Sequence, residues 1–347
     1  MEGQYKMELN DILDEIKANL TGDPLKDGPY LKQQADKYKD EPFSRELQEK
    51  MAEILVQITE KDYKTTLYTF LDKKNKEIDH QLESVRKRFK NLNFNGGNKI
   101  LEEIIRNNIF AWNDTDKYTY KCFGTPLEYI LFKNLFEDEQ REIKPVNCDL
   151  AKVYRLFCIG LSQKKRYADA RNAIERAVEL NPVDPEVYKT FIELAKIQRD
   201  LPTLKHCAEM LLKCAVNKEQ VGYAYFAYSF YYSEMKEYRN ALAMLQMSKL
   251  FRESDLYETE LEYIGRNLGY SGEPPLFDKN QLMVIMNNEN IQPGPPAAVA
   301  GIANHVAKEF EDQGELKYAK YFYDIVYELT ESEKIAEHIE ELEKKIK

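Results

Sequence analysis

The residues best suited to hold a metal ion are His206, Cys207 and Cys214, which combine an imidazole with two soft sulfur ligands. All three lie on one expected helix, and Cys214 follows the other two by about two turns. Zinc needs ligands that converge from several elements, so we interpret these side chains as structural. We therefore expect neither a metal nor a cofactor in this protein.

Residues 95–99, Asn-Gly-Gly-Asn-Lys, superficially resemble a loop that binds phosphate. The segment lacks the Gly-Lys-Ser/Thr ending of such loops, and it follows an expected helix rather than a strand. We interpret it as the stop of that helix. Serine and histidine nowhere form a recognisable nucleophile–base motif, so we expect that the protein is not an enzyme.

The net charge of −10 at pH 7 argues against general affinity for nucleic acid or for anionic membranes. Residues 86–90, Arg-Lys-Arg-Phe-Lys, form the densest basic cluster, which we expect on the solvated face of a helix; binding to an acidic protein or RNA is the alternative. No apolar run approaches the ~20 residues that span a bilayer, so we expect no membrane insertion. The amino terminus lacks a signal-peptide pattern, and 5 irregularly spaced Cys indicate reduced thiols in the cytoplasm.

The composition favours long helices, because only 14 Gly and 13 Pro interrupt 347 residues. Residues 1–58 predict short helices. Breaks between them are expected at 21–24, 28–29 and 40–42. Further helices are expected at 99–112 and from Pro126 to about Phe136, and residues 142–148 are expected to form a linker.

Residues 61–92 predict one long helix, because apolar residues recur at steps of three and four along a single seam. The seam consists of Tyr63, Leu67, Leu71, Ile78, Leu82, Val85, Phe89 and Leu92. Lys74 interrupts it, so we favour packing against neighbouring helices of the same chain and hence a monomer. A coiled-coil dimer through residues 61–92 is the alternative.

From residue 149 onward the sequence repeats itself with a period of about 34 residues, which indicates stacked structural units. Small and large residues alternate at fixed positions of the first unit: Tyr154, Phe157, Cys158, Leu161, Tyr167, Ala170, Ile174 and Ala177. Four units are expected, at 151–184, 185–218, 222–255 and 300–333. A non-standard hairpin at 254–296 separates the last two units, and an amphipathic helix at 332–347 caps the array.

This pattern resembles the tetratricopeptide repeat (TPR), and the whole chain resembles an uncharacterised bacterial TPR family without an assigned activity. The resemblance implies an all-α fold in which residues 148–347 form a superhelix (α-solenoid) of helical hairpins. An irregular helical module, residues 1–147, would precede it. It also implies a non-enzymatic scaffold or adaptor that binds a protein or peptide on its concave surface. The alternative is a peptide-sensing regulator in which the array controls the amino-terminal module.

The first helix of the third unit carries two aromatic stripes, which are offset by about 200° around the helix. By resemblance, Tyr225, Tyr228 and Tyr232 pack within the stack, and the other stripe faces the concave surface. The resulting candidate groove consists of Tyr223, Phe226, Phe230, Lys152, Arg155, Lys189 and Glu193. We expect an extended or helical peptide with an aromatic or aliphatic anchor on the third unit and a more acidic part toward Arg155 and Lys189. The alternative is that the chain fills this stripe itself, with the short helix at 279–289.

Some TPR proteins hold the carboxylate of a peptide terminus with Lys, Asn and Arg side chains on their first helices. The matching positions here hold Arg155, Ile159, Thr190, Tyr223 and Ala227. Since one cation remains of that set, we expect no such carboxylate clamp.

Overall fold

The computed structural model describes residues 2–21, 24–39, 41–59, 76–108, 114–136, 138–146 and 148–346. In these ranges the protein is all-α, as predicted, apart from one two-stranded sheet of β1 (Tyr118–Lys121) and β2 (Glu142–Pro145). The segment expected as a linker at 142–148 therefore begins with a strand. None of the described helices is long and apolar enough to cross a membrane.

The chain forms two compact units, and neither of them is continuous in sequence. Unit 1 contains residues 1–72, 123–142 and 297–347, and unit 2 contains residues 73–122 and 143–296. This division does not coincide with the expected boundary between residues 147 and 148. The fourth repeat unit belongs with amino-terminal helices rather than with the three units before it.

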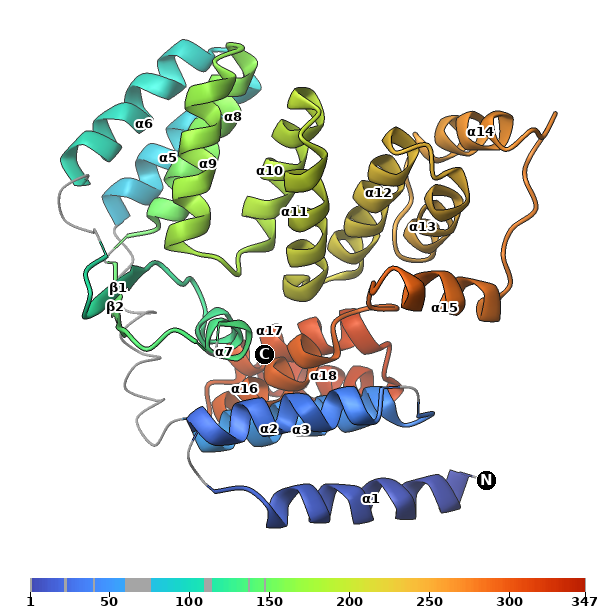
Figure 1. The fold of residues 1–347 in the computed structure, drawn as a ribbon. Coiled ribbons are helices and arrows are strands. Elements are labelled where there is room, and N and C mark those ends of the chain that lie inside the picture. Colours follow the sequence, from blue (N-terminus) through green and yellow to red (C-terminus); the bar gives the residue numbers. More distant parts are fainter. Residues whose placement is uncertain are drawn as a thin grey trace. The chain divides into compact units, whose positions relative to one another are not determined.

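Unit 1 is a cluster of helices around α16 (Ala297–Asp312), which packs against α3 (Ser44–Thr59) and α7 (Pro126–Leu135) (Figure 1). The other helices of the unit are α1 (Glu2–Ala18), α2 (Pro24–Lys37), α17 (Leu316–Thr330) and α18 (Glu333–Ile346). Helix α3 and helix α16 approach closely at Gly301, where an added Cβ would lie 2.6 Å from the carbonyl oxygen of Glu49. Helix α2 continues across residues 28–29, so the break expected there is wrong; a glycine before proline removes the Cβ clash that disfavours helix.

Unit 2 is built around three consecutive antiparallel helix pairs (Figure 1). They are α8 (Leu150–Gln163) with α9 (Tyr167–Leu180), α10 (Pro185–Gln198) with α11 (Leu201–Cys214), and α12 (Lys218–Glu234) with α13 (Tyr238–Phe251). The first helices also contact one another, α8 with α10 and α10 with α12. Together they form one continuous face of the unit.

The turn inside each helix pair has the same left-handed conformation. It occurs at Lys165, Arg199 and Lys236, with φ of 60°, 54° and 61°, and at Gly314 between α16 and α17, with φ of 78°. In all four turns the next residue donates its N–H to the carbonyl five positions earlier, at 2.8–3.0 Å. The bond satisfies a carbonyl at the end of the first helix. The same helix-ending turn therefore recurs in every pair.

Lys236→Gly is expected to raise the free energy of unfolding by about 0.5–1 kcal/mol, because a left-handed conformation strains any residue with a Cβ. Arg199→Gly should have the same effect, and chemical denaturation followed by circular dichroism measures both. The matched control is Lys164→Gly, since Lys164 has an ordinary φ of −92°. Stabilisation by the control as well would show that the turn conformation is not the cause.

Two further helices, α5 (Lys76–Lys90) and α6 (Phe94–Asn108), pack beside α8 in unit 2. Residues 61–75 of the expected long helix lie outside the described residues. The seam residues Ile78, Leu82 and Val85 are buried within the chain. Of the four basic side chains in residues 86–90, three are exposed to solvent.

The Asn-Gly-Gly-Asn segment is helical, so its interpretation as a helix stop is wrong. The chain turns earlier, at Leu92, and α6 begins at Phe94. The Asn93 side chain accepts the backbone N–H of Gly96 at 2.9 Å and thereby caps the new helix. Gly97 is needed there, because a Cβ would lie 2.3 Å from the Phe89 ring.

Helices α14 (Tyr257–Asn267) and α15 (Lys279–Asn288) occupy the region expected to be a hairpin. In the described structure both pack mainly on α13 rather than on each other. They therefore extend the third helix pair and do not form a hairpin of their own.

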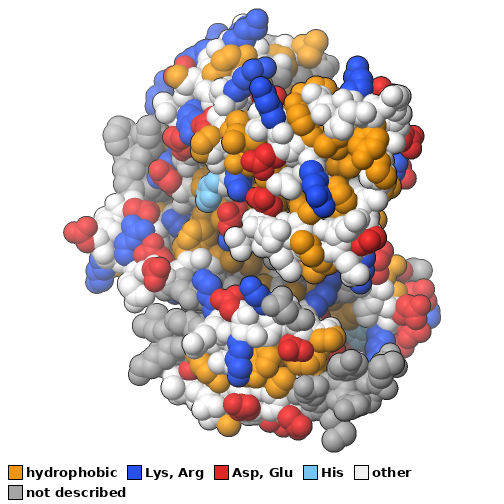
Figure 2. Space-filling model, turned by 45° about the vertical axis from the view of Figure 1, so that its right-hand side comes forward, with side chains coloured by type: hydrophobic (Ala, Val, Ile, Leu, Met, Phe, Trp, Pro, Cys, Tyr) orange, Lys and Arg blue, Asp and Glu red, His pale blue; other side chains and the backbone are white. Residues whose placement is uncertain are grey.

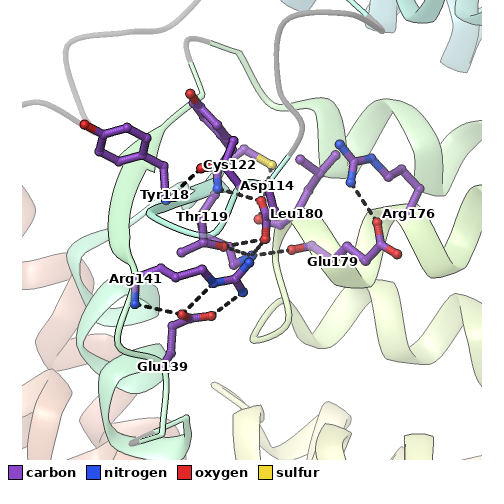
Figure 3. Close-up of polar contacts among 12 residues, drawn as sticks. Asp114, Tyr118, Thr119, Cys122, Glu139, Arg141, Arg176, Glu179 and Leu180 are labelled. Carbon is purple, nitrogen blue, oxygen red and sulfur yellow. Dashed lines mark hydrogen bonds and ion pairs between the residues drawn. The ribbon is translucent and has the colours of Figure 1, made fainter.

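The strand β1 connects to the end of α9 through the buried Lys121. Figure 3 shows residues around this connection, among them Asp114, Thr119, Glu179 and Leu180. Lys121 donates from Nζ to the carbonyl of Glu179 and to the hydroxyl of Thr119, both at 2.8 Å, and lies 3.8 Å from a carboxylate oxygen of Asp114. The next backbone N–H, that of Cys122, donates to the carbonyl of Leu180 at 3.0 Å. These bonds satisfy carbonyls at the carboxyl end of α9, where a positive charge is favourable.

Candidate functional site

All seven residues of the candidate groove lie on α8, α10 and α12, the first helices of the three pairs in unit 2. Lys152 and Arg155 are on α8, Lys189 and Glu193 on α10, and Tyr223, Phe226 and Phe230 on α12. The fold thus brings onto neighbouring helices residues that are separated by up to 78 positions in the sequence.

Helix α12 presents its two aromatic stripes in different environments. The packing stripe, Tyr225, Tyr228 and Tyr232, is fully buried, as expected for core residues. In the other stripe, which we call the aromatic stripe, Phe226 is 8% exposed, and Tyr223 and Phe230 are half-buried. The aromatic stripe is therefore partly open to solvent.

The hydrogen bonds described for the segment that follows α15 are made to the packing stripe. The Tyr225 hydroxyl donates to the carbonyl of Gln292 and accepts the N–H of Gly294, both at 2.7 Å. The Tyr232 hydroxyl donates to Glu289 at 2.7 Å. The described contacts of this segment thus differ from the expected alternative, in which the helix at 279–289 fills the aromatic stripe.

Long cationic side chains lie over the aromatic stripe instead. Lys196 Nζ is 5.3 Å from the ring centres of Tyr223 and Phe226 and 5.5 Å from that of Phe230. The Arg252 guanidinium lies 5.1 Å from the first of these centres and 5.6 Å from the second. At such distances the face of a ring attracts a cation.

Sequence reasoning missed both of these cations. Lys196 follows Lys189 by seven residues on α10, so helical periodicity could have placed it on the same face. Arg252 gives no such signal, because it follows the end of α13. Its position depends on Gly222, where an added Cβ would lie 2.4 Å from the Cβ of Arg252. The hydroxyl of Ser248 donates to the Gly222 carbonyl at 2.8 Å and secures this close approach.

A row of ion pairs, which we call the charge ladder, links the helices of this face. It begins on α8 with Arg155–Glu186 at 3.8 Å and continues with Glu186–Lys189 at 3.6 Å, Lys189–Glu219 at 2.9 Å, Glu219–Arg252 at 3.6 Å and Glu193–Lys196 at 3.0 Å. Figure 2 shows charged and apolar side chains interspersed over the face of the molecule in view. Arg155 and Lys189 are thus already paired with carboxylates of the chain itself.

No protein-family model matches the sequence, and no curated protein matches it significantly. Among the described residues, no three His, Cys, Asp or Glu side chains are arranged to hold a metal ion. We therefore infer the function from the geometry of this face.

Glu193 and Tyr223 form a hydrogen-bonded pair at the centre of the face. Burial by itself would raise the pKa of Glu193, but Lys196, the hydrogen bond from Tyr223 and Arg252 together lower it. Burial, followed by the charge of Glu193, raises the pKa of Tyr223. The phenol therefore keeps its proton and donates to a carboxylate that stays charged.

At the other end of the ladder, Arg155 interacts with Asp149 and Asp184, which cap the amino ends of α8 and α10. Burial raises the pKa of both carboxyl groups, that of Asp184 to about 6, and the positive charge of Arg155 opposes the rise. The charged form of Asp184 therefore reduces the stability of the folded state.

Asp184→Asn is expected to raise the free energy of unfolding by about 1–3 kcal/mol at pH ~7.5, and to leave it nearly unchanged at pH ~4. Because the pKa is raised in the folded protein, the cost of the charge is present above that pKa and disappears as the pH falls toward the unfolded value. Asparagine keeps the capping function, so the change isolates the charge. Urea denaturation of both proteins across this pH range measures the difference.

Asp200→Asn is a control that is expected to change the free energy of unfolding in the opposite direction. Hydrogen bonds from Arg171 and Thr203 lower the pKa of Asp200, which caps α11. This variant should therefore be less stable than the natural protein at neutral pH, and the deficit should shrink as the pH falls through the lowered pKa. The same pH dependence in both variants would contradict the assignment for Asp184.

Proposed function

We propose that unit 2 binds a peptide, or an exposed segment of another protein, on the face formed by α8, α10 and α12. In this proposal the protein is a non-enzymatic scaffold or adaptor. The observation that carries it is the aromatic stripe, in which three large rings lie in a row beneath Lys196 and Arg252. Aromatic side chains of this kind concentrate binding energy in protein interfaces, and long cationic side chains can move aside to admit a ligand.

We further propose that the helix pairs are tetratricopeptide repeats. Three features support this: the pairs follow the 34-residue register, the left-handed turn recurs at the same position, and Ala170, Ala241 and Ala319 are fully buried at equivalent places. First helices of such repeats line the concave surface, which agrees with the contacts of α8 with α10 and of α10 with α12. Five buried thiols are in keeping with a reducing compartment such as the cytoplasm.

The test uses the full chain, because residues 148–347 contain parts of both units. Peptides that bind the natural protein are selected from a phage-displayed library, and their affinities are measured by calorimetry. Replacing both Phe226 and Phe230 with Ser should weaken binding at least ~30-fold, which corresponds to about 2 kcal/mol. Thermal denaturation of the same variant reports any loss of stability, since Phe226 is mostly buried.

The matched control replaces Ile197 and Met235 with Ser. Both are large apolar residues near the same helices, but they are 54% and 46% exposed and lie outside the aromatic stripe. This control should bind normally. If the Phe226 and Phe230 variant loses stability but not affinity, the stripe is a structural element of the fold and the proposed function is wrong.

A further inference from the structure

The two partners of each ion pair in the charge ladder differ consistently in their exposure to solvent. The side chain of Arg155 is 18% exposed and that of Glu186 is 42% exposed. For Lys196 and Glu193 the values are 16% and 58%. Lys189 and Arg252 are 22% and 21% exposed, whereas their shared partner Glu219 is 51% exposed. The cations therefore lie against the protein, and the carboxylates extend into solvent.

The aromatic stripe explains this arrangement. Lys189, Lys196 and Arg252 all lie within 5.3 Å of the ring centre of Tyr223. Their aliphatic stems bury apolar area on the rings, and the charged ends gain the attraction of the ring faces. Such contacts draw the cations down onto the surface, whereas the shorter glutamate side chains extend into solvent beside them.

A ligand that approaches this face meets carboxylates first. Glu219 uses one oxygen for Arg252 and the other for Lys189, but a carboxylate has about four acceptor positions, so it can accept further hydrogen bonds. A guanidinium or ammonium group of the ligand can use these positions. A carboxylate of the ligand would instead approach like charges.

We infer that the face binds a basic peptide segment, in which Arg or Lys side chains flank an aromatic or aliphatic anchor. The inference rests on the proposed peptide binding and specifies the partner. The basic side chains pair with the exposed carboxylates of Glu186, Glu193 and Glu219, and the anchor displaces Lys196 from the aromatic stripe. This preference for a basic partner is opposite to the expectation from the sequence, in which a more acidic part of the peptide lies toward Arg155 and Lys189.

Two fluorescein-labelled peptides test the inference on the full chain. One is Gly-Arg-Ser-Arg-Trp-Leu-Arg-Ser-Arg-Gly, and the other has Glu in place of every Arg. Fluorescence anisotropy should show that the basic peptide binds at least ~10-fold more tightly than the acidic one, and that the preference weakens between about 50 and 200 mM salt. Tighter or equal binding of the acidic peptide, or binding of neither peptide, would overturn the inference.

Site variants separate this face from the general negative charge of the protein. Changing both Glu193 and Glu219 to Gln should weaken binding of the basic peptide about 10-fold. The control changes Glu175 and Glu209 to Gln; both are exposed carboxylates in ion pairs on the second helices α9 and α11, and their loss alters the net charge equally. Equal effects of the two double variants would also refute the inference.

Lys196→Met adds a measurement that does not depend on carboxylate loss. Removing this competing cation should strengthen binding of the basic peptide several-fold, whereas a site for acidic ligands would become weaker. The Phe226 and Phe230 variant distinguishes the two proposals. Suppose that this variant binds both peptides equally weakly and that the charge of the peptide does not affect affinity. Peptide binding is then supported, and the preference for a basic peptide is wrong. If the variant binds both peptides as tightly as the natural protein does, the assignment of peptide binding to this face is wrong.

Discussion

Leu82→Ala is expected to lower the free energy of unfolding by about 3 kcal/mol, whereas Leu92→Ala should change it by less than about 0.5 kcal/mol. Both residues belong to the seam that the sequence predicts along one helix. In the structure Leu82 is 1% exposed and packs among Val85, Leu101 and Ile104, so its truncation leaves a cavity. Leu92 lies in the turn after α5 and is 76% exposed.

Chemical denaturation followed by circular dichroism measures both variants, and Leu92→Ala serves as the control. A large loss at Leu92, or none at Leu82, would contradict the packing of α5. Light scattering over a dilution series tests the alternative that the seam at 61–92 forms a dimer. Because Leu82 is already buried within the chain, we expect the mass of a monomer at every concentration; a persistent dimer that Leu82→Ala dissociates would favour the coiled coil.

Lys121→Met is expected to lower the free energy of unfolding by about 2–3 kcal/mol. Methionine fills nearly the same space but cannot donate to Glu179 and Thr119, and the carbonyl at the end of α9 then loses a charged partner. Asp114 also loses the nearby positive charge. Urea denaturation at neutral pH measures the change.

Lys117→Met is the control for this substitution. Lys117 directly precedes strand β1 and lies 5.1 Å from the ring centre of Tyr118, but it is exposed to solvent. Its replacement should alter the free energy of unfolding by less than about 0.5 kcal/mol. If Lys121→Met is equally mild, the lysine does not link β1 to α9 as the structure indicates.

The positions of the helices in the repeat region, and the register within each pair, could be predicted from the amino-acid pattern. The second helix of the first pair illustrates this: Ala170, Ile174 and Ala177 were expected at its fixed packing positions, and all three are buried. Such patterns depend on helical periodicity and on a turn within one stretch of chain. The opposed stripes of α12 were predictable for the same reason.

Local signals failed where a neighbouring side chain decided the backbone. Gly96 and Gly97 were expected to stop a helix, but the first is hydrogen-bonded to Asn93 and the second accommodates Phe89. A glycine pair serves equally as a helix end or as a site of close packing. The sequence contains no signal that separates the two uses.

Which elements contact one another could not be predicted in this way and is visible in the folded protein alone. The tertiary structure placed the fourth helix pair in unit 1 beside α3, laid the segment after α15 on Tyr225 and Tyr232, and brought Arg252 over Tyr223. It also decided that the cations of the charge ladder are less exposed to solvent than their carboxylate partners. These features arise from contacts between segments far apart in the chain, whose free energies depend on shape and burial that periodicity within one helix does not encode.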